Sequence, residues 1–116
     1  MELGFRSNQR IKRSSEFLRI KTHGKRRIKG CLVANWMKTD EGAKSRLGVI
    51  TSRRVGGAVT RNRARRLMRE AFRLNQHRFT YSIDLILVAR RSICGMKRQD
   101  VERDFLRIMK SSGLIT

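Results

Sequence analysis

The sequence predicts a single α+β domain in which three helices pack on one small sheet, and three observations lead to this prediction. A chain of 116 residues with 39% hydrophobic residues is long enough for one modest core. Ser52–Phe72 takes on a helical period after its two glycines, whereas Ser82–Arg90 is a near-continuous apolar run of strand length. Helical and strand patterns follow one another along the rest of the chain, as expected for helices packed on a sheet.

The first segments are an arm and a short helix. Residues 1–9 show no period, and we expect them to form a flexible arm that leads into the domain. Ser14 or Ser15 is predicted to cap a helix whose apolar side carries Phe17 and Ile20. Gly24 is expected to end this helix as a C′ residue.

Two strands are predicted before the central helix. Gly30–Lys38 and Arg46–Thr51 have strand composition, and Thr39–Ser45 between them is rich in turn residues. The two strands are therefore expected to form an antiparallel hairpin. Lys25–Lys29 is interpreted as a basic approach to the first of them, and a further short strand within residues 25–51 stays open.

The central helix is strongly amphipathic. One arc of roughly 140° is apolar and holds Ala64, Leu67, Met68, Ala71 and Phe72. An arc of roughly 100° almost opposite is basic and holds Asn62, Arg65, Arg66, Arg69 and Arg73. Glu70 is the one acidic residue in this stretch, at helical spacing from Arg66 and Arg73. The remaining guanidinium groups repel one another, which favours contact with an outside polyanion such as a nucleic-acid backbone.

A strand and a helix complete the domain. Asp84, near the start of Ser82–Arg90, has no second carboxylate close by in sequence, which favours a strand-end hydrogen-bonding role over catalysis. The last helix is predicted at Arg98–Ser111, with an apolar side made of Val101, Phe105, Ile108 and Met109. The residue patterns alone give the order α-β-β-α-β-α, with a right-handed crossover as the default.

The charge of the chain points to a nucleic-acid partner. A net charge of +20 and a pI near 11.8 imply strong self-repulsion, which binding to a polyanion relieves. A membrane surface is the rival partner, but the sequence has neither an 18-residue apolar run nor a signal-peptide core. We therefore expect a soluble, cytoplasmic protein that does not bind membranes.

Few side chains in the sequence suggest chemistry of their own. Cys31 and Cys94 are widely separated and are interpreted as small buried hydrophobes in a reducing compartment. His23 and His77 are isolated, so neither a metal site nor a catalytic histidine is predicted. Trp36 has two interpretations, a core residue or a surface on which a base stacks.

A specific motif spans the start of the central helix. It consists of Arg53-Arg54, Gly56, Ala58-Val59, Arg61-Asn62-Arg63, Arg65-Arg66 and Arg69-Glu70. This pattern resembles the signature of the protein subunit of bacterial ribonuclease P, the ribonucleoprotein that removes 5′ leaders from precursor tRNA. The resemblance extends to residues 10–24 and 84–90, and thus covers most of the chain.

The resemblance implies more than the spacing does. The family fold is α-β-β-β-α-β-α, a small and mostly antiparallel four-stranded sheet of a ribosomal-protein-like type, with a left-handed crossover around the signature helix. The family's catalysis belongs to the RNA subunit and its Mg²⁺ ions, so the chain alone should bind no cofactor and cleave nothing. The protein binds that RNA and holds the single-stranded leader between the first helix and the sheet. Residues 1–116 would then be one RNA-binding domain, with no DNA partner.

Site residues follow from the resemblance by position. Those matched to contacts with the RNA subunit are Arg53, Arg54, Arg61, Asn62, Arg63, Arg65, Arg66, Arg69 and Arg73. Those matched to the leader are Phe17, Lys21, Trp36, Arg90 and Arg91. The sequence departs from the family where Lys21 replaces a second aromatic residue. It departs again where the strand reads Leu32, Asn35 and Trp36 instead of offering Phe and Tyr.

Two alternatives to a ribonuclease P subunit stay open. A structural RNA-binding protein of the ribosomal type would share the charge, the size and the α+β build. A stand-alone nuclease would need an acid–base pair, a nucleophile or a ligand cluster, and the sequence offers none. The arginine motif favours the ribonuclease P subunit over both.

Overall fold

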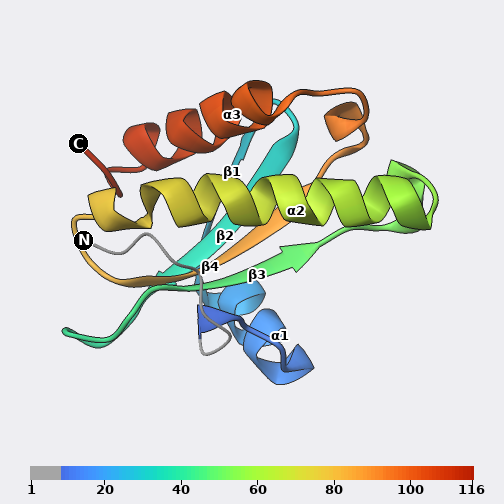
Figure 1. The fold of residues 1–116 in the computed structure, drawn as a ribbon. Coiled ribbons are helices and arrows are strands. Elements are labelled where there is room, and N and C mark those ends of the chain that lie inside the picture. The colour runs from blue at the N-terminus through green and yellow to red at the C-terminus, as the bar shows by residue number, and fades with distance from the viewer. Residues whose placement is uncertain (1–8) are drawn as a thin grey trace.

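The computed structural model describes residues 9–116. The elements are, in chain order, α1 (Ser14–His23), β1 (Lys25–Lys29), β2 (Leu32–Lys38), β3 (Arg46–Ile50), α2 (Ala58–Asn75), β4 (Ile83–Ala89) and α3 (Arg98–Ser111). Figure 1 shows α2 and α3 above a single sheet and α1 below it. The order α-β-β-β-α-β-α confirms the fold implied by the resemblance, and α3 has the predicted bounds. No helix within residues 9–116 is long and apolar enough to cross a membrane.

The described part of the chain includes only the last residue of the predicted arm, residues 1–9. Residues 1–8 lie outside the described part of the chain, but Gln9 belongs to the domain. Its side chain is buried, and its Nε2 donates to Ser45 O at 3.1 Å and to Gln76 Oε1 at 2.6 Å. The backbone of Ile11 then donates to Leu47 O at 2.9 Å, which lays the entering chain against β3.

The sheet order is β1-β2-β4-β3, so one predicted strand pairing is wrong. β2 and β3 form no hairpin, because β4 lies between them, antiparallel to β2 and parallel to β3. β4 is buried along nearly all its length, and such a strand takes a central position. The hairpin is instead β1–β2, and β1 is the exposed edge strand whose existence the residue pattern left open.

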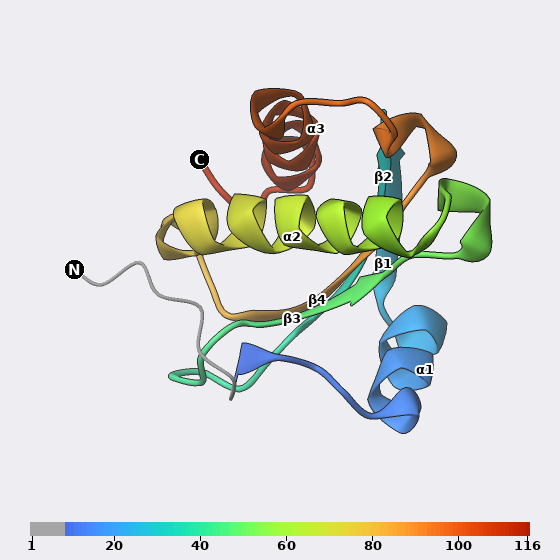
Figure 2. The ribbon, with the colours of Figure 1, turned by 45° about the vertical axis from the view of Figure 1, so that its right-hand side comes forward.

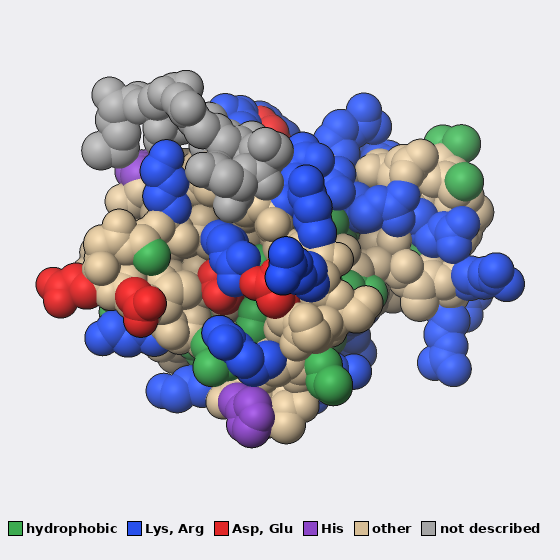
Figure 3. All heavy atoms as spheres, turned by 90° about the horizontal axis from the view of Figure 1, so that it is seen from below, with side chains coloured by type: hydrophobic (Ala, Val, Ile, Leu, Met, Phe, Trp, Pro, Cys, Tyr) green, Lys and Arg blue, Asp and Glu red, His purple; other side chains and the backbone are tan. Residues whose placement is uncertain are grey.

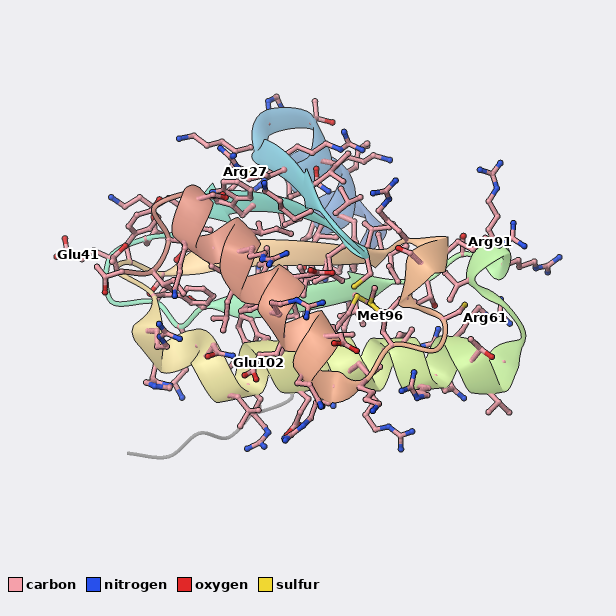
Figure 4. All side chains as sticks on the ribbon, turned by 90° about the horizontal axis from the view of Figure 1, so that it is seen from above. Arg27, Glu41, Arg61, Arg91, Met96 and Glu102 are labelled. Carbon is pink, nitrogen blue, oxygen red and sulfur yellow. The ribbon has the colours of Figure 1, made fainter. Side chains whose placement is uncertain are left out.

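The crossover from β3 through α2 to β4 is left-handed, against the right-handed default. Figure 4 views the sheet from the side of α2 and α3; β3 and β4 run to the right, and β4 lies above β3. For a given strand order, the hand of the connection decides which face of the sheet the helix covers. The left-handed connection places α2 on the same face as α3, where the two helices contact each other.

The larger core lies between the sheet and these two helices. α2 contributes four fully enclosed side chains, Ala64, Met68, Ala71 and Phe72, whereas Leu67 is half-buried. α3 contributes Val101, Phe105, Ile108 and Met109, as predicted. The Phe72 and Phe79 rings meet at a centroid distance of 5.8 Å, so the turn after α2 is also fixed by the core.

A smaller apolar cluster lies on the other face, under α1. Figure 2 shows α1 alone on this side of the sheet. Ile11, Ile20 and Ile86 are buried there, with Phe17 and Met37 packed partly against them. This face is thus covered by one short helix and stays partly open.

Both predicted ends of α1 need correction. Arg13, not a serine, is the N-cap residue, and no side chain caps the helix. Gly24 ends the helix with φ −84°, so it is not a left-handed C′ residue. Glycine is required there for space, because a Cβ atom would lie 2.4 Å from Ile20 O and 2.5 Å from Trp36 O.

The two cysteines differ, although both were expected to be buried. Cys31 follows Gly30 in the β1–β2 turn and is fully buried, and its backbone N–H donates to the buried Asp104 at 3.0 Å. Burial, together with the nearby Asp104 carboxylate, raises the pKa of the Cys31 thiol to about 12. Cys94 is exposed, and its Sγ donates to Val55 O at 2.8 Å.

The burial pattern of α2 predicts a difference between two neighbouring positions. Met68→Ala should lower the free energy of unfolding by about 2–5 kcal/mol, because it leaves a cavity in a closed core. Leu67→Ala should cost roughly 1 kcal/mol, because that side chain is only partly buried at the edge of the core. Urea unfolding followed by circular dichroism measures both. A larger loss at Leu67 would show that α2 is rotated about its axis.

Candidate nucleic-acid interface

The outer side of α2 forms a groove lined by arginines. Burial of Ala64, Met68 and Phe72 turns the opposite side of the helix to the surface. A hollow of about 510 Å³ runs along that side, which we call the α2 groove, lined by Arg10, Asn62, Arg65, Arg66, Arg69, Glu70 and Arg73. Five of the residues predicted to contact RNA are therefore brought together in one surface.

Much of the charge in the α2 groove is not neutralised by the described carboxylates. Glu70 pairs with Arg73 at 2.5 Å and not with Arg66, and the hydrogen bond from Arg73 lowers the pKa of Glu70. Partial burial lowers the pKa of Arg69, and the neighbouring Arg10 and Arg65 lower it further. The cost of charging Arg69 is what an anion in the groove would relieve.

Arg65 is held in place before any ligand binds. Its Nη1 donates to Thr51 Oγ1 at 2.6 Å, and its Nη2 donates to Asn62 Oδ1. Thr51 follows β3, so this contact ties the groove to the end of that strand. Asn62 thus helps to fix the position of the Arg65 guanidinium group.

The other motif residues lie near the N-terminal end of α2. Arg53 and Arg54 are exposed on the turn that precedes the helix. Arg63 donates to Met96 O at 2.5 Å, so it fastens α2 to the loop before α3. Figure 4 shows Arg61 at the same end of the molecule as Arg91.

Phe17 lies where the resemblance places the leader, on the face of the sheet under α1. It is half-buried, and its ring rests on Gly48 of β3, where a Cβ atom would come within 2.7 Å of the Phe17 Cζ. Lys21 is exposed one helical turn further along. Ile50, at the end of β3, is 37% exposed on the same face, so an apolar surface remains open beside the ring.

Trp36 does not share this face, which corrects its assignment to the leader. Successive strand residues point to opposite sides, and Leu32, Ala34 and Trp36 all belong to the core under α2 and α3. Trp36 is only 5% exposed and offers no free ring face for stacking. Asn35, like Met37, lies on the face of β2 toward α1, and it is buried opposite Ile86 of β4.

Arg90 and Arg91 are exposed directly after β4. The Arg90 backbone donates to Cys31 O at 2.8 Å, and its Nη1 donates to Gly30 O at 3.1 Å. The β1–β2 turn therefore positions Arg90. Asp104 supports that turn from α3 through the Cys31 N–H.

Sequence reasoning missed two functional features because each depends on contacts between distant segments. Arg10 enters the α2 groove from the N-terminal segment, and only its place in a basic cluster hinted at a role. Arg46 holds α1 to the sheet: it pairs with Glu16 at 2.6 Å and reaches Asp84 through two bonds of 3.0 and 2.8 Å. Asp84 thus has the predicted strand-end role, and these bonds raise the pKa of Arg46.

The side chains that the two surfaces offer are suited to binding phosphates and bases. Within residues 9–116, no group of three or more His, Cys, Asp and Glu side chains is placed to hold a metal ion. The two surfaces described instead offer guanidinium groups and one aromatic ring, which bind phosphates and bases.

Comparisons with known proteins agree with this geometry. The family model described as Ribonuclease P matches residues 5–113. The ribonuclease P protein component of Pelotomaculum thermopropionicum is 36% identical over 104 residues, covering 90% of this chain and 92% of that protein. That of Desulfatibacillum aliphaticivorans is 39% identical over 90 residues, covering 78% and 75%.

A solved structure shows the same fold. The Staphylococcus aureus RNase P protein superposes with a TM-score of 0.84 at 26% identity, over 93% of this chain and 98% of that one. Sequence, fold and arginine surface therefore lead to one conclusion: the chain belongs to the ribonuclease P family, as a protein component of that bacterial ribonucleoprotein endonuclease.

Proposed function

We propose that this protein binds the catalytic RNA subunit through the α2 groove and holds the 5′ leader of precursor tRNA beside Phe17. The observation that carries the proposal is the α2 groove, where Arg66 and Arg69 make no ion pair among residues 9–116. Arginine forms paired hydrogen bonds to phosphate, and RNA supplies a closely spaced row of phosphates.

The RNA subunit is the better partner for the α2 groove than a single strand. The residues that line the α2 groove are all polar or charged, and four of its arginines are spaced along one rigid helix. Such a surface suits the fixed phosphate positions of a folded RNA. Arg53 and Arg54 are exposed on the turn before the helix and add positive charge at its N-terminal end.

The leader is the better partner for the face under α1. Phe17 presents a partly open ring beside apolar Ile50, and a single-stranded base can stack there. Lys21, Arg90 and Arg91 supply charge for the leader phosphates. Lys21 stands where the family pattern has a second aromatic residue, so charge contacts carry more of the binding here than in the family pattern.

The two surfaces are joined at the edge of β3. A hollow of about 170 Å³ there is lined by Arg10 and Arg69, which also line the α2 groove, and by Gly48, which lies under Phe17. Bound RNA subunit and bound leader would therefore come close together. The protein acts in the cytoplasm. The RNA subunit holds the Mg²⁺ ions and carries out the cleavage.

The proposal predicts an activity that depends on both components. The purified protein alone should not cleave precursor tRNA, because residues 9–116 hold no cluster of His, Cys, Asp and Glu side chains that could bind a catalytic metal ion. Added to a bacterial ribonuclease P RNA, it should lower the Mg²⁺ concentration needed for cleavage. Cleavage assays across a magnesium series measure this. Robust cleavage by RNA-free protein, or no shift in the magnesium dependence, would refute the proposal.

The α2 groove predicts a salt dependence. Arg65→Gln and Arg69→Gln should each lower the slope of log affinity for the RNA subunit against log salt by about 0.7–0.9, the effect of one phosphate contact. Arg107→Gln on the exposed side of α3 is the matched control and should leave the slope unchanged. Filter binding between about 50 and 400 mM salt gives the slopes. If Arg65, Arg69 and Arg107 behave alike, the α2 groove does not contact the RNA.

The leader surface predicts a dependence on leader length. Phe17→Ala should weaken holoenzyme binding of a precursor with a leader of several nucleotides by about 1–3 kcal/mol, the worth of one stacked base. A substrate with a one-nucleotide leader should bind as before. Phe17→Leu, which keeps the packing on Gly48, controls for a loss of stability. Equal losses for both substrates in a folded variant would remove Phe17 from the leader site.

A further inference from the structure

α1 has a second exposed side that the proposed function does not use. Ile20 faces the sheet, Phe17 and Lys21 lie to one side of it, and Glu16, Arg19 and His23 lie to the other. The contacts agree with this division, since Glu16 pairs with Arg46 and not with any residue beside Phe17. The second side faces the start of β3 and the end of β2.

Two hollows run along this second side and meet at Lys38. The larger, of about 490 Å³, is lined by Arg19, Lys38, Thr39, Asp40, Ala43, Lys44, Arg46 and Asp84. The smaller, of about 260 Å³, is lined by His23, Gly24, Lys25, Trp36, Met37, Lys38 and Tyr81. We call the two together the flank groove. It is separated from the Phe17 side by the body of α1.

The flank groove is positively charged and mostly uncompensated. Arg19, Lys25, Lys38 and Lys44 are exposed, and none of them makes an ion pair within residues 9–116. Asp84 in its lining is engaged, because Asp84 and the neighbouring Glu16 both bind Arg46. Asp40 lines the larger hollow as well and offsets part of this charge. Figure 3 shows Lys and Arg side chains around a small group of Asp and Glu on this face.

Two further observations point to a ligand with phosphates and bases. The Thr39 hydroxyl oxygen is buried at the larger hollow and has no hydrogen-bond partner among the described residues. A buried hydroxyl is normally satisfied, and a phosphate oxygen would satisfy this one. In the smaller hollow, Tyr81 is 36% exposed, and Lys38 Nζ lies 5.0 Å from the centre of its ring. A ring beside a cation is a platform on which a nucleic-acid base stacks.

We infer that the flank groove binds a second stretch of RNA, with phosphates at Arg19, Lys38 and Lys44 and a base against Tyr81. α1 then lies between two RNA strands, one on its Phe17 side and one on its Arg19 side. The inference rests on the proposed function, because the strand comes from one of the two RNAs named there. An acidic peptide would also meet the lysines, but it would leave the Tyr81 platform without a use.

The test removes two charges from the flank groove and compares the result with the same change elsewhere. Lys38→Gln with Lys44→Gln is the test variant. Arg107→Gln with Lys110→Gln, at exposed positions of α3 on the opposite face of the sheet, is the matched control. The slope of log affinity against log salt is measured in three binding experiments. One uses the protein and the RNA subunit; the other two use the holoenzyme, with precursor tRNA that has either a long or a one-nucleotide leader. The test variant should lower one of these slopes by about 1.4–1.8 relative to the control, the effect of two phosphates that are no longer neutralised.

The binding experiment in which the salt slope falls identifies the RNA that occupies the flank groove. A fall for the RNA subunit assigns the strand to that RNA, and a fall only for the long leader assigns it to the substrate. Tyr81→Leu should weaken binding in the same experiment about fivefold or more, whereas Tyr81→Phe, which keeps a ring, should not. If test and control variants match in every experiment while wild type still binds both RNAs, the inference is wrong and the proposed function stands. If wild type binds neither RNA, the proposed function itself fails.

Discussion

The packing of Ala64, Met68 and Phe72 against the sheet fixes the rotation of α2, and every arginine that α2 contributes to its groove depends on that rotation. A helix turns 100° per residue, so a change of one position in the buried stripe would move the guanidinium groups away from the surface they now form. The left-handed crossover supports the same core packing, because it places α2 beside α3 on one face of the sheet. The buried core stripe and the arginine groove proposed to bind RNA are therefore two sides of one helix.

The scarce carboxylates explain why so much positive charge stays available. The chain has 9 acidic residues against 29 Lys and Arg, and several acids are engaged inside the protein. Asp84 and Glu16 bind Arg46, Asp104 binds the β1–β2 turn, and Glu102 accepts from Asn75 Nδ2 at 2.8 Å. Such acids hold elements together and cannot neutralise the surface. The free protein is thus strained by its own charge in the places where RNA would relieve it.

The sequence predicted what periodicity determines and missed what long-range pairing determines. α2, α3 and β4 follow from their own hydrophobic patterns, and the arginine motif identified the α2 groove. The sequence of β1, Lys25–Lys29, shows no alternation of apolar and polar residues, and all five residues are exposed. Only its pairing with β2 makes it a strand. Which face of the sheet Trp36 and Asn35 occupy depends on the strand register, because a shift of one residue moves each side chain to the opposite face. Cys94 and Gln9 were misplaced because their surroundings come from distant segments.

The unequal covering of the two sheet faces explains where binding surfaces can exist. Two helices close one face around a large core, which leaves the outer side of α2 at the surface, where we propose that RNA binds. One ten-residue helix covers the other face and rests on a cluster with three buried side chains. Gly48 lets that helix approach closely through Phe17, and Arg46 anchors its first turn. A short helix held at these points leaves open sheet on one side and a basic groove on the other. The incomplete cover is thus the source of both candidate strand-binding surfaces.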